Sequence, residues 1–419
     1  MVVTAELAKY TNSLIEFQCS IFDRLVDGED VKEVAGDVRK IISHLYEKST
    51  DRELGISVND ICNLACSHCY YDNTHDKSKE AKESDGNYLS ASQWVDVVDQ
   101  ALVYPIRHFS IVGKEPLLPE SGVPRTKAIL ERLEGAKSQF PDITYEMVNN
   151  GHFITRNLDW LANLNFGFFS VSFDGDKEAH NAIRGERAYE KSLEGISRAH
   201  SAGIRNLTAT YTAMPQNVLS LGQMIKDLSS VGLEYLSIGF CFNTPGNNHS
   251  LQASFDSVEK AIDIVRVAPG GLDITLAIQG EDHPELIAEF YRRGHANPRN
   301  LAVTEDLSPT LVMPFPTDSG SRAALQVNIL PTAFEVGMRI DYDGKFIDFC
   351  RDRRAKEKTG FAHFPNHSVR DAMKISREEI WPEYTVKYYT RLQQALRGEK
   401  PNELEHWYSS PFVPLNVAN

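Results

Sequence analysis

The sequence lacks a run of apolar residues long enough to cross a lipid bilayer, and its N-terminus lacks a basic segment followed by an apolar stretch. A membrane-spanning helix needs about 20 mostly apolar residues in a row, and a secretory signal needs the second pattern. We therefore expect a cytoplasmic protein that has no membrane partner.

Positive charge is also scarce, because 44 Lys and Arg residues are opposed by 58 Asp and Glu residues, giving a net charge of −14. Nucleic-acid binding needs a basic surface that neutralises phosphates, so we expect no nucleic-acid partner. The acidic field would attract a cationic substrate, such as an amino sugar or a basic peptide. An acidic surface that only keeps the protein in solution is an equally good interpretation.

Cysteine is rare as well, with six residues in 419. Cys19, Cys241 and Cys350 are far apart and do not show the spacing of a disulfide framework, in agreement with a reducing compartment. The other three lie within eight residues, in the run Cys62-Asn-Leu-Ala-Cys66-Ser-His-Cys69.

This run offers three thiolates from one short loop. A [4Fe–4S] cluster normally takes four thiolates, so three ligands leave one iron open for chemistry. A structural zinc site or a set of buried thiols is the alternative. Structural zinc usually needs a second Cys or His pair, and none follows at the usual spacing. We therefore predict that Cys62, Cys66 and Cys69 bind a [4Fe–4S] cluster.

Short apolar runs alternate with amphipathic helical patterns from residue 54 to residue 242. Such alternation implies parallel strands joined by right-handed crossovers, with active residues at the carboxyl ends of the strands. The sequence predicts an α/β fold, a partial (βα)6 TIM-like barrel, with the cysteine run at the end of its first strand. The expected strands are 55–61, 108–112, 143–148, 167–173, 207–212 and 235–242.

The flanking segments show other patterns. The turn Tyr342-Asp343-Gly344 between two apolar runs predicts a hairpin in a mixed α/β region. The expected domains are a helical N-terminal segment (1–50), the barrel (51–245), a substrate-capping domain (246–377), and a C-terminal helix and tail (378–419).

The cysteine run, followed by Tyr70, resembles that of the radical S-adenosylmethionine (SAM) superfamily, whose members carry Cys-x-x-x-Cys-x-x-Cys after the first barrel strand. The resemblance implies that SAM is a cofactor, chelated at the open iron through its amino and carboxylate groups. One electron, from a reducing partner such as flavodoxin or ferredoxin, then yields a 5′-deoxyadenosyl radical that abstracts hydrogen from the substrate.

The hairpin around Gly344, which ends in Cys350, resembles a SPASM or twitch domain of the same superfamily. Such a domain carries an auxiliary cluster, which generally takes four cysteines, but only three remain outside the main run. The resemblance therefore implies a degenerate twitch-like C-terminal domain without its metal.

Further motifs imply residues that bind SAM. Gly113, Lys114 and Glu115 correspond to the family's Gly-Gly-Glu, whose backbone receives the SAM amino group, although Lys114 replaces the second glycine. Asn150 lies in a run similar to the family's Thr-Asn-Gly, which by itself is often only a turn.

A longer run, from Ser170 to Gly185, resembles the family pattern Ser-x-Asp-Gly…His-x-x-x-Arg-Gly. It implies that Ser172 and Arg184 hold the SAM carboxylate. The chemistry agrees, because a guanidinium presents a fork of donors that matches a carboxylate. A strand-end serine and a surface arginine are the ordinary alternative.

Two of the remaining cysteines are candidate catalytic residues. Cys241 ends the sixth expected strand, and Cys350 ends the hairpin. A thiol has a weak S–H bond and can return a hydrogen atom to a substrate radical. A buried cysteine with no catalytic role is the alternative for both.

The sequence therefore predicts a radical SAM oxidoreductase or epimerase. We expect it to abstract hydrogen from a C–H bond of a polar small molecule, such as an amino sugar, and to give epimerisation or dehydrogenation. The alternative is radical modification of a ribosomally made peptide in natural-product biosynthesis. A sensor or scaffold that only binds the cofactors is disfavoured, because the cysteine run, Ser172 and Arg184 are all intact.

Overall fold

The computed structural model describes residues 5–46, 52–69, 88–104, 106–242, 251–280, 283–303, 310–331, 337–347 and 360–399. Consecutive parallel strands form its centre, each hydrogen-bonded to the next. They are β1 (Glu53–Ile56), β2 (His108–Ile111), β3 (Thr144–Asn149), β4 (Phe168–Phe173), β5 (Leu207–Ala213), β6 (Tyr235–Phe240) and β7 (Asp273–Gln279). The predicted α/β fold with parallel strands is confirmed.

The parallel series continues beyond the six predicted units, because β7 pairs in parallel with β6. On the far side of β7, β10 (Ala323–Asn328) runs parallel to β7. The next strand, β9 (Leu311–Phe315), runs antiparallel to β10, and β8 (Ala302–Val303) runs antiparallel to β9. At the other edge β11 (Gly337–Ile340) is parallel to β1.

The predicted hairpin is confirmed at this second edge. Strand β12 (Lys345–Ile347) runs antiparallel to β11, and β13 (Ala362–His363) runs antiparallel to β12. The sheet therefore has the order β13-β12-β11-β1-β2-β3-β4-β5-β6-β7-β10-β9-β8 in the described part of the chain. Segments that follow residue 245 thus extend both edges of the sheet that the first six strands begin.

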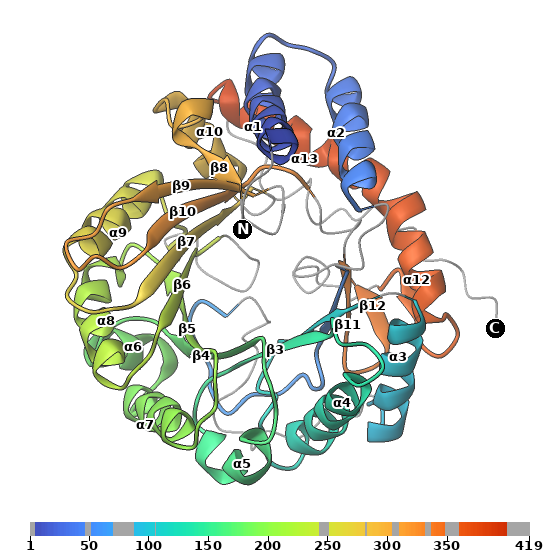
Figure 1. The fold of residues 1–419 in the computed structure, drawn as a ribbon, viewed down its shortest axis with the longest axis vertical. Helices are drawn as coiled ribbons and strands as arrows, with labels where there is room; N and C mark the ends of the chain where they lie inside the picture. The colour runs from blue at the N-terminus through green and yellow to red at the C-terminus, as the bar shows by residue number, and fades with distance from the viewer. Residues whose placement is uncertain are drawn as a thin grey trace.

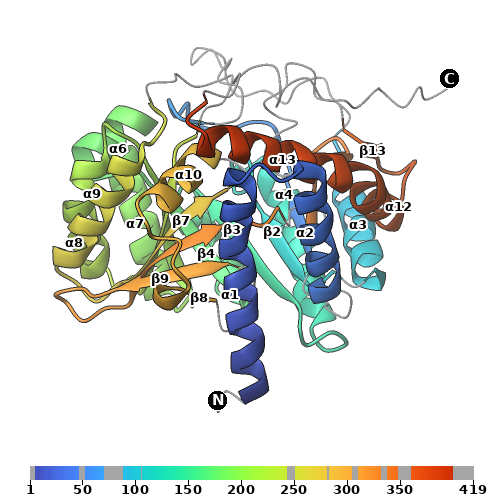
Figure 2. The ribbon, with the colours of Figure 1, turned by 90° about the horizontal axis from the view of Figure 1, so that it is seen from above.

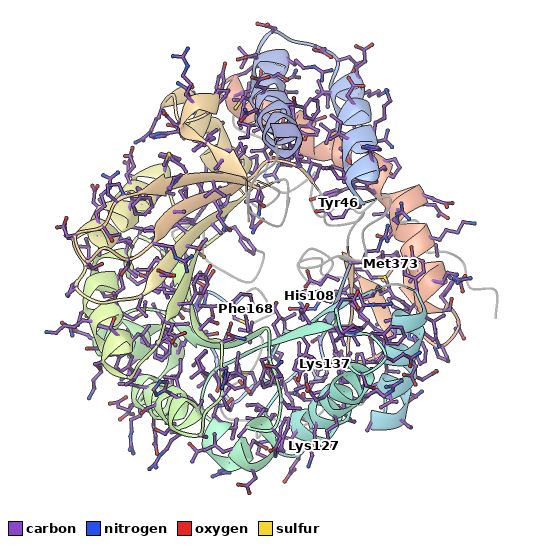
Figure 3. The ribbon with its side chains drawn as sticks, in the orientation of Figure 1. Tyr46, His108, Lys127, Lys137, Phe168 and Met373 are labelled. Atoms are coloured by element: carbon purple, nitrogen blue, oxygen red, sulfur yellow. The ribbon has the colours of Figure 1, made fainter. Side chains whose placement is uncertain are left out.

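Helices cover the outside of the curved sheet (Figure 1). Apolar side chains of the strands, such as Phe109, Val171 and Phe173, are fully buried in the core that results. Figure 3 shows Lys127 on the outer helix α4, and His108 on the inner side of the strands. The helices are α3 (Ala91–Val103), α4 (Gly122–Ala136), α5 (Ile154–Leu161), α6 (Lys177–Arg184), α7 (Ala188–Ser201), η1 (Val218–Ser220), α8 (Leu221–Ser230), α9 (Phe255–Val267), α10 (Pro284–Arg292), η3 (Pro298–Asn300), α12 (Val369–Ile375) and η4 (Ser376–Ile380).

Among the described residues, the two edges of the sheet do not pair, and three helices lie between them: α1 (Ala5–Val26), α2 (Val31–Tyr46) and α13 (Trp381–Leu396) (Figure 1). Figure 2 shows α1 and α2 side by side, with α13 across them. Phe22 of α1 is fully buried and stacks on Tyr291 of α10 at 5.0 Å, and Gln393 Nε2 of α13 donates to the Leu25 carbonyl at 3.1 Å. The first and last described helices therefore complete the wall of the barrel.

Among the described helices, none combines the length and apolar character that a bilayer crossing requires.

Candidate active site

The carboxyl ends of β1 to β7 meet at one rim, where a cavity of about 470 Å³ opens. Cys350 lies outside the described residues, but every other predicted site residue lines this cavity. These residues are Cys62, Cys66, Cys69, Gly113, Lys114, Glu115, Asn150, Ser172, Arg184 and Cys241. The structure thus brings together residues that are nearly 180 positions apart in the chain, because parallel strands place all their carboxyl ends on one side.

The cysteine loop follows β1 and is held in place by backbone hydrogen bonds. Cys69 N donates to the Cys66 carbonyl at 3.1 Å, and Ser67 N donates to the Ile183 carbonyl of α6 at 3.1 Å. His68 Nε2 lies 3.5 Å from Asp174 Oδ2 at the end of β4. His68 therefore links the loop to the sheet, which agrees with three cysteine ligands rather than a Cys–His zinc set.

The chemistry of the three thiols fits an iron–sulfur cluster. Burial, together with the nearby Glu115 carboxylate, raises the pKa of Cys62 to about 12, and burial raises the pKa of Cys66 to about 11. Thiolates are thus costly here unless a cation accompanies them, and the irons of a cluster supply that charge. The loop would hold the cluster through Cys62, Cys66 and Cys69.

The segment after β2 is shaped by glycine and by a buried carboxylate. Gly113 has φ +132°, a conformation that only glycine adopts readily. Glu115 is 1% exposed, and its carboxylate accepts hydrogen bonds from Leu117 N and Asn150 N, both at 2.9 Å. Burial raises its pKa to about 7, although these two bonds and Arg184 act in the opposite direction. Because both oxygens of the Glu115 side chain accept hydrogen bonds from the backbone of two loops, this segment would contact SAM through its own backbone instead.

Arg184 forms a buried ion pair with Asp174, which the sequence did not mark as a site residue. Arg184 Nε donates to Asp174 Oδ2 at 2.5 Å, and the Asp174 side chain is fully buried. Burial alone would raise the pKa of Asp174, but Arg184, His68 and His180 hold it at about 2. The only signal for Asp174 in the sequence was its place in the Ser-x-Asp-Gly run.

The ion pair leaves part of the guanidinium available to a ligand. No described residue accepts a hydrogen bond from the terminal Nη nitrogens of Arg184, although the side chain lines the cavity. Ser172, on β4, also lines it and accepts a hydrogen bond from Thr210 Oγ1 at 3.4 Å. This pair of residues fits the carboxylate of SAM in chemistry and in position on the rim.

Cys241 lies directly after β6, buried and lining the cavity. Its backbone N donates to the Ala213 carbonyl at 2.9 Å, and its side chain packs in a small cluster with Ile183, Met214 and Leu251. The thiol is therefore placed on the same cavity as the cysteine loop, as the barrel prediction required.

The opposite wall of the cavity contains residues that the sequence did not single out. Gln279 ends β7. His283 directly precedes α10, is 2% exposed, and its Nε2 lies 2.8 Å from the Phe240 carbonyl oxygen. They were missed because only six strands were expected to reach the rim. The remaining polar lining on this side consists of Thr210, Tyr211, Thr212 and Ser237.

Comparison with known proteins agrees with this geometry. Residues 56–228 match the model of the Radical SAM superfamily. The fold is similar to Streptococcus suis SuiB bound to precursor peptide SuiA, with a TM-score of 0.56 and 14% identity over 82% of this chain and 69% of that one. It is also similar to anSMEcpe with bound AdoMet, with a TM-score of 0.53 and 12% identity over 80% and 84% of the two chains.

Curated relatives match a shorter region. A probable GTP 3′,8-cyclase of Methanococcus maripaludis is 26% identical over 200 residues, 47% of this chain and 62% of that protein. The GTP 3′,8-cyclase of Actinobacillus pleuropneumoniae serotype 7 is 27% identical over 165 residues, 39% of this chain and 45% of that protein. The chain thus spans less than two thirds of the length of these relatives.

The fold, the cavity and the thiol loop together fit a site for a [4Fe–4S] cluster and SAM. Residues 56–228 are a domain of the radical SAM superfamily, to which the resemblance of the cysteine run had pointed.

Proposed function

We propose that this enzyme abstracts a hydrogen atom from a C–H bond of a polar small molecule, such as an amino sugar, and that it epimerises that carbon. Dehydrogenation of the same substrate is the second outcome of this proposal. The observation that carries it is the position of Cys241, a buried thiol on the same cavity as Cys62, Cys66 and Cys69.

When bound, the [4Fe–4S] cluster and SAM would supply a 5′-deoxyadenosyl radical able to remove a hydrogen atom from the substrate. In the proposed epimerisation, the Cys241 thiol donates its own hydrogen atom to the opposite face of the carbon. The sulfur radical that remains takes one electron from the reducing partner, a flavodoxin or ferredoxin, and one proton from solvent. Atoms and charge then balance, and the thiol is restored.

The lining of the cavity supports a substrate that is recognised through hydroxyl groups. Thr210, Thr212, Ser237 and Gln279 offer neutral donors and acceptors on the wall next to Cys241. Glu115 is the carboxylate among the described lining residues, and both of its oxygens already accept backbone hydrogen bonds. A substrate amino group would therefore bind as a hydrogen-bond donor rather than as the partner of a free carboxylate.

A peptide substrate is the second candidate. It is favoured by the similar folds of SuiB, which was crystallised with a precursor peptide, and of anSMEcpe, which was crystallised with the Kp18Cys peptide. Among the described parts, however, α1 is engaged with α10 and α13 through Phe22 and Leu25. The N-terminal helices would thus grip a peptide only with the faces that this packing leaves exposed.

The test is turnover of the reconstituted enzyme in D2O, with dithionite, SAM and a panel of amino sugars and their neutral hydroxyl analogues. We expect one substrate to stimulate 5′-deoxyadenosine release and to gain one deuterium at an inverted carbon. Cys241→Ala should still release 5′-deoxyadenosine but form no deuterated epimer, as measured by mass spectrometry and NMR.

Cys350→Ala is the matched control, because it removes the other candidate thiol. If both variants form the wild-type epimer, neither cysteine returns the hydrogen and the epimerase proposal is wrong. If only peptides stimulate SAM cleavage, the second candidate replaces the first.

A further inference from the structure

Two N–H groups point at the sulfur of Cys62. The backbone N of Leu64 donates to Cys62 Sγ at 3.4 Å, and the side-chain Nδ2 of Asn150 donates to it at 3.8 Å. The same Asn150 Nδ2 also donates to Asn63 Oδ1 at 2.8 Å. Asn150, at the end of β3, thus contacts both a cluster ligand and the residue next to it.

The orientation of the Asn150 amide is fixed by a backbone group. His152 N, which can only donate, lies 3.0 Å from Asn150 Oδ1, so this atom must be the oxygen. The amide nitrogen must then face Cys62 and Asn63. If the amide were flipped, Asn150 Nδ2 would face His152 N, and both of these groups are donors.

The backbone of Asn150 is held equally firmly. Its N donates to Glu115 Oε2 at 2.9 Å, and its carbonyl accepts from Ser192 Oγ of α7 at 2.7 Å. The next residue, Gly151, has φ +84°, and a Cβ atom there would lie 2.7 Å from Ser192 Cα. The loop is therefore packed directly against α7, and Asn150 is only 5% exposed.

The network continues to a histidine side chain. Since Asn63 Oδ1 accepts from Asn150, its Nδ2 is the donor to His152 Nδ1, at 2.9 Å. His152 must then be neutral with its proton on Nε2, in agreement with a pKa that burial and nearby Lys191 lower to about 4. The direction of each hydrogen bond between Asn150, Asn63 and His152 Nδ1 is thus fixed, although His152 Nε2 has no hydrogen-bond partner among the described residues.

We propose that Asn150 raises the reduction potential of the cluster through its N–H···S hydrogen bond to Cys62, and that Asn63 and His152 are positioning residues for this bond. Reduction adds one negative charge to the cluster and its thiolates. A hydrogen-bond donor to a ligand sulfur stabilises that charge and so favours the reduced form. The proposal depends on the cofactor alone, not on the substrate.

The test is a redox titration of the reconstituted full-length protein, monitored by EPR, without SAM and without substrate. For Asn150→Ala we expect a more negative midpoint potential, by roughly a tenfold change in the ratio of reduced to oxidised cluster, or about 59 mV for one electron. Asn150→Asp keeps the acceptor for His152 but cannot donate to sulfur, so its shift should be at least as large.

Asn149→Ala is the matched control, because the Asn149 side chain bonds to the Ser170 carbonyl and to Gly151 N and not to Cys62. Its midpoint potential should equal that of the wild type. If Asn150→Ala fails to bind iron, the midpoint potential of the isosteric Asn150→Asp variant tests the proposal instead.

Three outcomes would overturn the proposal. Equal potentials in the wild type and in the Asn150 variants would exclude the hydrogen bond as a determinant. A shift of the same size in Asn149→Ala would mean that loop distortion is the cause. Unchanged potentials combined with weaker SAM binding would make Asn150 a contact of SAM instead. None of these outcomes depends on whether the enzyme is an epimerase.

Discussion

The two sides of the cavity differ in both chemistry and origin. The side formed after β1 to β4 carries the cysteine loop and the charged residues Lys114, Glu115 and Arg184. The side formed by β5 to β7 carries hydroxyl, amide, thiol and imidazole groups among its described residues. The first side lies within the part that matches the superfamily model, whereas Cys241, Gln279 and His283 lie beyond it.

This difference indicates a division of labour. The charged side has the groups that a cluster and a zwitterionic cofactor need, and these groups are held by buried pairs such as Asp174–Arg184. The neutral side has groups that suit a hydroxylated substrate. For the proposed function we therefore expect substitutions on the first side to weaken or abolish the binding and cleavage of SAM, and those on the second to alter only the reaction of the substrate.

The largest effect is expected for Cys62→Ala. With two thiolates left, the loop can no longer hold the cluster, so the iron content should fall far below about four per chain and release of 5′-deoxyadenosine should cease. Iron and sulfide analysis after anaerobic reconstitution measures the first effect, and chromatography the second. A variant that keeps its cluster and cleaves SAM would refute the assignment of the charged side. Gln279→Ala, on the neutral side, should keep both.

A smaller effect is expected for Arg184→Lys. Lysine keeps a positive charge beside Asp174 but loses the fork of the guanidinium, so the Kd for SAM should rise about 10- to 100-fold, as for a lost charge-assisted hydrogen bond. Isothermal titration with SAM on the reconstituted protein measures this change. An unchanged Kd would show that the fork does not hold the SAM carboxylate.

Arg184→Ala is less informative, because it leaves the Asp174 carboxylate buried without its partner. Removing one member of a buried pair destabilises a protein by about 3–5 kcal/mol. Weak SAM binding in that variant could therefore result from a distorted fold, which the lysine variant avoids.

The last effect concerns stability and pH rather than SAM chemistry, and it tests whether the charged side is strained without its cofactors. Because the pKa of Glu115 is raised to about 7 in the folded apoprotein, the folded state binds more protons than the unfolded state between about pH 4.5 and 7. The contribution of Glu115 to the free energy of unfolding is therefore fully present below about pH 4.5 and is lost as the pH rises through 7. The loss is about 3 kcal/mol, at 1.36 kcal/mol per pKa unit.

Glu115→Gln cannot ionise, so its free energy of unfolding should lack this fall between pH 5 and pH 7.5. Denaturant unfolding of both apoproteins at the two pH values measures the difference. Parallel pH profiles for the wild type and the variant would mean that Glu115 does not titrate in this window.

The sequence alone predicted those features that depend on neighbouring residues. The spacing of Cys62, Cys66 and Cys69 determines that one loop offers three thiolates. The alternation of apolar runs with helical patterns determines the parallel strands, and hence that Gly113, Ser172 and Cys241 reach one rim. Both signals are local, because a motif and a period are written in consecutive residues.

Tertiary structure decided the features that join distant segments. The pairing of β11 with β1, the packing of α13 on α1, and the arrival of His283 at the cavity link residues that lie far apart in the chain. The hydrogen bond from Asn150 to Cys62 spans 88 positions. No local period records such contacts, because they follow from how strands order in the sheet and from which buried polar groups must find partners.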